Sequence, residues 1–185
     1  MAELGTGLWI LPDRPVGELL QAVLDSERQG LDEFWLGDEG PAREPFSGLA
    51  AASMVTDRIR LCTGVTNPYL RHPALTASTA LTIHEFSGGR MVLGVGAGGD
   101  MSLQPFGFDV VDPVSRVRSF VEIVRSVAQR RACDEYQPPS YAIDENLVGS
   151  RLTVFVGSRS EQMNRLASEV ADGVFVAGMP PFRFG

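Results

Sequence analysis

Short apolar runs alternate along the chain with longer segments in which apolar residues recur at helical spacing. The apolar runs, bounded by turn residues, predict strands at 4–11, 33–37, 58–65, 91–96, 152–157 and 173–177. The segments between them predict helices at 16–29, 45–55, 73–86, 113–128 and 161–171. The Pro-rich stretch at 130–150 is expected to be an irregular surface excursion.

This alternation predicts one α/β domain over residues 1–185, because strands joined by helices pair in parallel through right-handed crossovers. Two architectures fit the pattern, an open doubly wound sheet and a closed (β/α)8 barrel. A barrel typically needs about 250 residues, whereas this chain has 185. Length alone therefore favours the open sheet.

The charge balance narrows the range of partners. Sixteen basic residues against 23 acidic ones give a net charge of −7. Nucleic acids and anionic membranes both call for a basic surface, so neither is expected as a partner. All the basic residues are arginine, which excludes Schiff-base lysine chemistry and a phosphate-binding lysine of the Walker type. No apolar run is long enough to predict a membrane span.

The spacing of the two cysteines and the composition of residues 1–5 both favour a cytoplasmic location. Cys62 and Cys133 lie far apart, outside the CxxC spacing of zinc sites and redox motifs. Neither a disulfide nor a metal site is therefore expected. Residues 1–5 have neither the basic nor the long apolar region of an export signal. We expect a cytoplasmic protein with reduced thiols.

The loop after the third predicted strand, residues 64–73, is rich in polar side chains. Active sites of α/β folds lie at the carboxyl ends of the strands. The side chains expected near a ligand are those of Thr66, Asn67, Arg71 and His72. The competing interpretation is a turn punctuated by Asn-Pro and followed by a helix N-terminus. The loop by itself favours neither interpretation.

Two acidic residues, Asp38 and Glu39, follow the second predicted strand and share that end of the sheet. A carboxylate there can orient a ligand or move a proton, although Asp38 can equally cap a loop. The two histidines, His72 and His84, lie in one local segment, so nucleophile–base catalysis has little support. His84 falls within a predicted helix and is expected to be structural.

Residues 94–99 read Gly-Val-Gly-Ala-Gly-Gly. A dinucleotide-binding fingerprint requires GxGxxG after the first strand, with a helix beginning at once. Here the spacing is GxGxGG, and the segment follows the fourth predicted strand. The favoured interpretation is a glycine loop that lets the backbone approach a flat ligand, because glycine has no Cβ to block the contact.

Four segments together resemble the luciferase-like monooxygenase superfamily, and most closely its coenzyme F420-dependent branch, which includes methylenetetrahydromethanopterin reductase-like proteins. They are FWLGDEG, RIRLCTGVTNPYLRHPALTA, HEFSGGRMVLGVGAGGDMSLQPFG and VFVGSRSEQMNRLASEVADGV. The resemblance covers most of residues 4–178 and implies a (β/α)8 TIM-type barrel in place of the open sheet. Only about six strand–helix units are present, which implies an incomplete barrel: either a truncated member or a longer chain with segments omitted.

The resemblance also implies where the cofactor lies. Coenzyme F420, or alternatively FMN, is expected at the carboxyl ends of the strands, its ring backed by a bulge with a non-prolyl cis bond at Gly64–Val65. Asp38 matches a ring-contacting residue, and Glu39 stands where many members have histidine. The phosphate-bearing tail is expected near residues 157–159, beside a helix N-terminus near Ser160. The implied cofactor-binding residues are Asp38, Gly64, Val65, Thr66, Asn67, Gly96, Ala97, Gly98, Gly157, Ser158 and Arg159, and the implied catalytic residues are Asp38 and Glu39.

The function that the resemblance implies is hydride transfer between F420 and a small organic substrate. Two alternatives stay open: an FMN-dependent monooxygenase of the same fold, and a degenerate barrel that binds a flavin-like ligand or a partner without turnover. Six parallel strands cannot close as eight do. The first and sixth strands would then present unpaired edges, so we expect a second copy to cover them in a homodimer.

Overall fold

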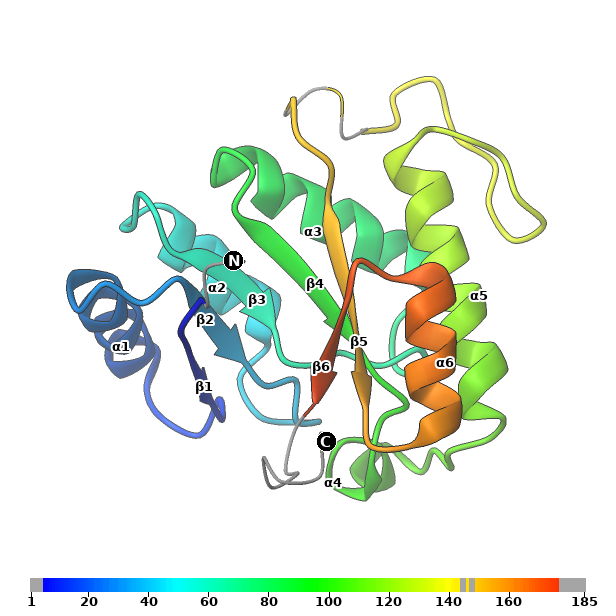
Figure 1. Cartoon of the computed structure of the whole chain (residues 1–185), viewed down its shortest axis with the longest axis horizontal. Helices are drawn as coiled ribbons and strands as arrows, with labels where there is room; N and C mark the ends of the chain where they lie inside the picture. The colour runs from blue at the N-terminus through cyan, green and yellow to red at the C-terminus, as the bar shows by residue number, and fades with distance from the viewer. Residues whose placement is uncertain (1–4, 144–145, 147–148, 177–185) are drawn as a thin grey trace.

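The computed structural model of the chain describes residues 5–143, 146 and 149–176. The described strands form one parallel sheet (Figure 1): β1 (Gly7–Ile10), β2 (Glu33–Leu36), β3 (Arg60–Thr63), β4 (Met91–Val95), β5 (Thr153–Ser158) and β6 (Gly173–Val176). The described helices are α1 (Val16–Arg28), α2 (Pro45–Ser53), α3 (Pro73–Phe86), α4 (Asp100–Leu103), α5 (Pro113–Ala128) and α6 (Glu161–Val170), with a 3-10 turn η1 (Gln104–Phe106).

The strands lie side by side in chain order, from β1 to β6, and each is parallel to the next. A doubly wound sheet reverses its strand order at a switch point, so the open doubly wound sheet that length alone favours is wrong. The sheet curls strongly, as contacts between distant strands show. The centroid of the Trp35 ring in β2 lies 5.7 Å from that of Phe155 in β5 and 4.6 Å from that of Phe175 in β6. The described sheet is an incomplete barrel, as the family resemblance implied.

Successive side chains of each strand divide between two apolar cores, as the two-residue period of a strand dictates. Phe34, Leu61 and Leu93 point outwards into the main core, which the helices complete. Helices α1, α2, α3, α5 and α6 pack in that order around this convex face (Figure 1). Trp35 and Cys62 lie on the concave face in a smaller core with Val92. The central strands β2, β3 and β4 are mostly buried on both faces, which explains their nearly continuous apolar sequences.

The sequence predicted the bounds of α3 and α5 as observed, and those of α1, α2 and α6 within two residues. The short elements α4 and η1 were not predicted, because runs of three or four residues show no helical period. The third strand is shorter than predicted and ends at Thr63. Residue 4 of the first predicted strand and residue 177 of the sixth lie outside the described residues.

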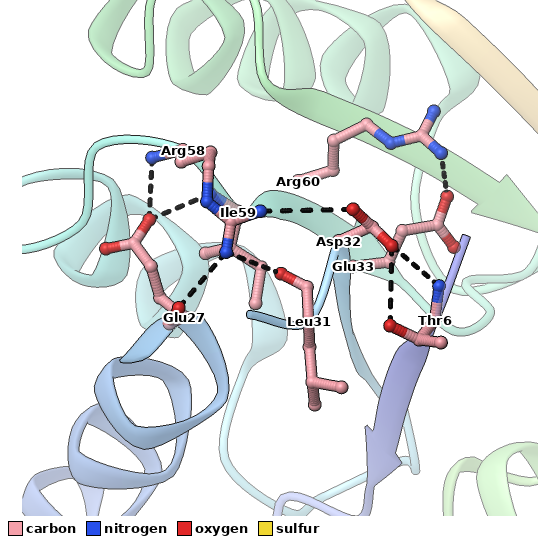
Figure 2. Close-up of polar contacts among 8 residues, drawn as sticks. All are labelled: Thr6, Glu27, Leu31, Asp32, Glu33, Arg58, Ile59 and Arg60. Atoms are coloured by element: carbon pink, nitrogen blue, oxygen red, sulfur yellow. Dashed lines mark hydrogen bonds and ion pairs between the residues drawn. The ribbon is translucent and has the colours of Figure 1, made fainter. Parts of the chain in front are cut away.

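Polar contacts between neighbouring loops hold the amino-terminal edge of the sheet together (Figure 2). The Glu27 carboxylate accepts hydrogen bonds from the backbone N–H groups of Arg58, at 2.6 Å, and Ile59, at 2.8 Å. The Asp32 carboxylate accepts one from the Thr6 backbone N–H at 2.7 Å. In barrels this edge serves stability, whereas the carboxyl ends of the strands carry the active site.

Candidate functional site

A cavity of about 580 Å³ opens at the carboxyl ends of the strands, a volume typical of small-molecule sites. Most residues predicted from the sequence line it, namely Asp38, Glu39, Gly64, Val65, Gly96, Ala97, Gly98, Gly157, Ser158 and Arg159. Gly99 and Ser160, which the sequence analysis named only as parts of the glycine loop and of the helix N-terminus, also line it. The lining residues that it missed are Trp9, Met101, Ser102, Met163 and Phe175. Thr66 and Asn67, which were also predicted, do not line the cavity. The loops after β2, β3, β4 and β5 therefore converge on one site.

The floor of the cavity is built from Val65 and the glycines beneath it. The Gly64–Val65 peptide bond is cis, as the resemblance implied. A Cβ atom at Gly96 would lie 2.7 Å from Val65 Cγ2, and one at Gly157 would lie 3.0 Å from it. Side chains do not pack so closely, so the Val65 side chain can occupy this place only because both neighbours are glycine. The result is an apolar floor made of one valine side chain and bare glycine backbone.

Thr66 holds the carboxylate of Asp38 in place at the cavity. Its backbone N–H donates to Gly94 O at 2.9 Å, and its carbonyl accepts from Gly96 N–H at 2.8 Å, so the residue is tied to β4. Its hydroxyl donates to Asp38 Oδ2 at 2.7 Å. Burial raises the pKa of Asp38, and Glu44 adds to the rise, whereas the Thr66 hydrogen bond and Arg71 oppose it.

Glu39 provides a second carboxylate directly beside Asp38. Burial raises the pKa of Glu39, and the charge of Asp38 raises it further, while the Arg159 guanidinium lowers it. The turn that presents both acids passes close to α4: a Cβ at Gly40, whose φ is +57°, would lie 3.1 Å from Ser102 O. Two neighbouring acids of raised pKa thus stand at the cavity wall, and the charge of Asp38 contributes to the shift of Glu39.

The other polar residues of the loop after β3 take structural roles. Asn67 is buried, and its Oδ1 accepts from the backbone N–H groups of Tyr69 and Leu70, at 3.1 Å each. His72 caps α3, its Nδ1 accepting from Ala74 N–H at 3.2 Å. Arg71 and His72 line a separate cavity between the starts of α3 and α5. For Asn67, Arg71 and His72, the turn interpretation describes the geometry better than the ligand interpretation does.

Polar groups gather at the far end of the cavity, where β5 leads into α6. The Ser160 hydroxyl accepts from Met163 N–H at 3.3 Å and so caps the helix. The Ser158 hydroxyl donates to Ser160 O at 3.0 Å, which holds the turn. Arg159 is exposed at the cavity wall. An anion placed here would meet a guanidinium and the positive end of a helix dipole.

The missed lining residues include two aromatic side chains from the outermost described strands, Trp9 in β1 and Phe175 in β6. A signal for them was present, because both occupy the concave-facing positions of their strands. Trp9 is in register with Trp35, and Phe175 packs on the Trp35 ring. Reading the strand period across the sheet would have placed both on the ligand side.

In the part of the chain that the structure describes, no group of three or more His, Cys, Asp or Glu side chains could hold a metal ion. His84 is buried in α3, with Nε2 3.1 Å from Ser150 O and 3.0 Å from Ser150 Oγ, which fits the expected structural role. Among the described helices, none is both long and apolar enough to cross a bilayer.

Comparison with known proteins agrees with this geometry. Residues 3–184 match the model of the family described as luciferase-like monooxygenase. The 5,10-methylenetetrahydromethanopterin reductase of Archaeoglobus fulgidus is 35% identical over 181 residues, covering 96% of this chain and 54% of the relative. The 4-hydroxyprotoasukamycin monooxygenase of Streptomyces nodosus subsp. asukaensis is 31% identical over 138 residues, covering 67% of this chain and 37% of the relative.

A solved structure gives the same result for the fold. The coenzyme F420 dependent tetrahydromethanopterin reductase of Methanopyrus kandleri superposes with a TM-score of 0.83 at 27% identity, covering 95% of this chain and 56% of that one. The chain thus spans about half the length of the relatives it matches. Together with the match over nearly all of its residues, this superposition means that the chain belongs to the luciferase-like monooxygenase family.

Proposed function

We propose that this chain forms the ring-binding part of a coenzyme F420-dependent oxidoreductase that transfers hydride between F420 and a small organic substrate. The observation that carries the proposal is the cavity in which the Val65 floor, the Asp38–Glu39 pair and Arg159 meet. The name of the Methanopyrus kandleri reductase, which includes coenzyme F420, supports F420 as the cofactor.

The residues present fit such a cofactor. The apolar floor at Val65 suits a planar ring, because the glycines around it leave the backbone open to close contact. The turn at Ser158 and Arg159 suits an anionic tail. When bound, F420 supplies a hydride carrier at C5 of its deazaflavin ring.

The protein's own part is positioning and proton handling. Asp38, held by Thr66, orients the polar edge of the ring. The carboxyl groups of Asp38 and Glu39, both with raised pKa, stand at the cavity wall, where either can give a proton to a substrate beside the ring or take one from it. Arg159 and the start of α6 orient the tail, while the apolar floor excludes water from one face of the ring.

A second candidate is oxygenation with FMN as the cofactor; the similarity to the 4-hydroxyprotoasukamycin monooxygenase supports the oxygenation. Both candidates use the same floor and the same anion end, so the cofactor itself separates them. The experiment is an equilibrium titration of the protein with F420 and, separately, with FMN, followed by the fluorescence of each ring. Micromolar binding of F420 and weaker binding of FMN are expected. Binding of FMN with no detectable binding of F420 would contradict the proposal.

Arg159→Gln tests the anion end in the same assay. Loss of one charge-assisted contact should weaken F420 binding about tenfold. Arg165→Gln is the matched control, because Arg165 lies on α6, directly after the turn that holds Arg159, is exposed, and pairs with Glu161 rather than lining the cavity. Equal weakening by both variants would mean that overall charge, and not a tail site, governs binding.

The proposed assembly is a homodimer in a reducing, cytoplasmic setting. Each outermost described strand has an unpaired edge and an exposed apolar side chain, Leu8 in β1 and Val174 in β6. Cys62 and Cys133 are free thiols, which suits a reducing compartment. Light scattering at micromolar concentration tests the assembly: a dimer is expected, and a stable monomer of 20.0 kDa contradicts it.

A further inference from the structure

We infer that Trp9 is a ligand-positioning residue, whose indole ring forms an aromatic wall of the cavity and holds the carbonyl group of Gly64 in place. The inference rests on the proposed function, because it takes the cavity to bind a planar, conjugated ring. It adds a residue that comes from β1, outside all the segments that carry the family resemblance.

The first observation is how closely the indole meets the bulge after β3. Trp9 Nε1 donates a hydrogen bond to Gly64 O at 2.5 Å. A Cβ atom at Gly64 would lie 2.8 Å from Trp9 Cδ1, so the indole lies directly against this glycine. The Gly64 carbonyl precedes Val65, the floor of the cavity. Trp9 therefore fixes the position of the floor as well as forming a wall.

The second observation is the contrast with the neighbouring tryptophan. Trp35 is in register with Trp9 on the same concave face, but it is 4% exposed, and its Nε1 donates to Glu33 Oε2 at 2.7 Å. Trp9 is 41% exposed and lines the cavity, and Trp35 does not line it. Trp35 is thus a core residue, whereas Trp9 offers a held aromatic surface to whatever enters the cavity.

The chemistry of the contact follows from this arrangement. The only hydrogen-bond donor of the indole already has a partner in Gly64, so Trp9 can contact a ligand only through its π face and edge. Such contacts favour flat aromatic groups in offset or edge-to-face packing. The hydrogen bond also orients the ring before a ligand binds, which lowers the entropic cost of binding.

The test combines affinity with a signal from Trp9 itself. F420 affinity is measured for the parent protein, Trp9→Phe, Trp9→Leu and Leu8→Ala. Leu8 is the matched control, because it neighbours Trp9 on β1, is also exposed, and does not line the cavity. Trp9→Leu should weaken binding about tenfold, and Trp9→Phe, which keeps an aromatic face, about threefold or less. Leu8→Ala should bind as the parent does.

Nuclear magnetic resonance supplies a readout that a purely structural role would not move. The chain has two tryptophans, so Trp35→Phe assigns both indole N–H signals. Saturation with F420 should shift the Trp9 signal strongly and the Trp35 signal little, because ring-current effects fall steeply with distance. This measurement uses the parent protein, so it decides the question even if Trp9→Leu fails to fold.

An unmoved Trp9 signal at saturation, or parent-like affinity of a folded Trp9→Leu, would overturn the inference and leave the proposed function standing. A parent protein that binds neither F420 nor FMN would remove the proposed function, and this inference with it.

Discussion

The hydroxyl of Thr66 donates a 2.7 Å hydrogen bond to Asp38, which joins the loop after β3 to the loop after β2. Thr66 is itself paired to β4 through both of its backbone groups. The position of the Asp38 carboxylate is therefore set by three neighbouring strands at once. Such support is what a group that orients a ligand requires, because small displacements of a functional group cost much of its effect.

Thr66→Val should raise the pKa of Asp38 further. The variant keeps the shape of the side chain but removes the donor that favours the ionised form, and burial then acts with less opposition. Thr66→Ser, which keeps a hydroxyl, should leave the pKa close to that of the parent. Titration of the Asp38 carboxyl carbon by nuclear magnetic resonance measures both, and an equal midpoint in parent and Thr66→Val would show that the bond has no influence.

Asp38→Asn should raise the free energy of unfolding at pH 7 while weakening F420 binding. The pKa of Asp38 is higher in the folded protein than in the unfolded chain, where it is about 3.9. Ionisation of Asp38 at higher pH therefore lowers the free energy of unfolding, and the uncharged Asn side chain avoids this loss. The difference from the parent should disappear below about pH 4. Urea unfolding at both pH values measures it, with Asp109→Asn on an exposed loop as control. A difference that is the same at both pH values would exclude ionisation as its cause.

Gly96→Ala should distort the cavity floor, because the new methyl group would lie 2.7 Å from Val65 Cγ2. Overpacking of this kind costs about 1–3 kcal/mol of stability. Val65→Ala in the same chain removes the clashing methyl groups, so the double variant should recover stability relative to Gly96→Ala. Thermal unfolding of the parent, the two single variants and the double variant measures the coupling. Additive effects would mean that the two residues do not touch.

Glu27→Gln should lower the stability at neutral pH by about 1 kcal/mol. Burial tends to raise the pKa of Glu27, but hydrogen bonds from the backbone of Ile59, Arg58 and Asp57 prevail and lower it. Figure 2 shows the contacts with Arg58 and Ile59. The contribution of the ionised Glu27 carboxylate to the free energy of unfolding is present above its pKa in the unfolded chain, about 4.3. It is lost as the pH falls through the lower pKa of Glu27 in the folded protein. Urea unfolding from pH 7 down to pH 3 measures the loss. Glu122→Gln, at an exposed position of α5, is the control and should cost less at every pH.

Local patterns predicted the elements well: α3 and α5 both have a proline at the first position, and α5 also has apolar residues at helical spacing. Apolar alternation could not choose between an open sheet and a barrel, because both bury parallel strands on two faces. Chain length pointed to the wrong one, and family motifs gave the right one. The strand order that decides it depends on contacts between distant segments.

Most of the site was predicted from motifs, and the misses have physical causes. Asn67 has the right residue type at the right strand end, but its amide oxygen satisfies the backbone of its own loop. The strand period can place Trp9 on the concave face beside Trp35, but it does not show which of the two tryptophans is buried in the core and which lines the cavity. Only the curl of the sheet, which buries Trp35 and leaves Trp9 at the cavity, separates the two.

The central claim is that one cavity, with Val65 as its floor and Arg159 at its anion end, holds the F420 ring and tail. A crystal structure of the protein saturated with F420 tests it most directly. The account predicts the deazaflavin ring against Val65, its polar edge within hydrogen-bond distance of Asp38, and the phosphate-bearing tail at Ser158 and Arg159. A ring bound elsewhere on the protein, or a tail pointing away from the start of α6, would contradict it.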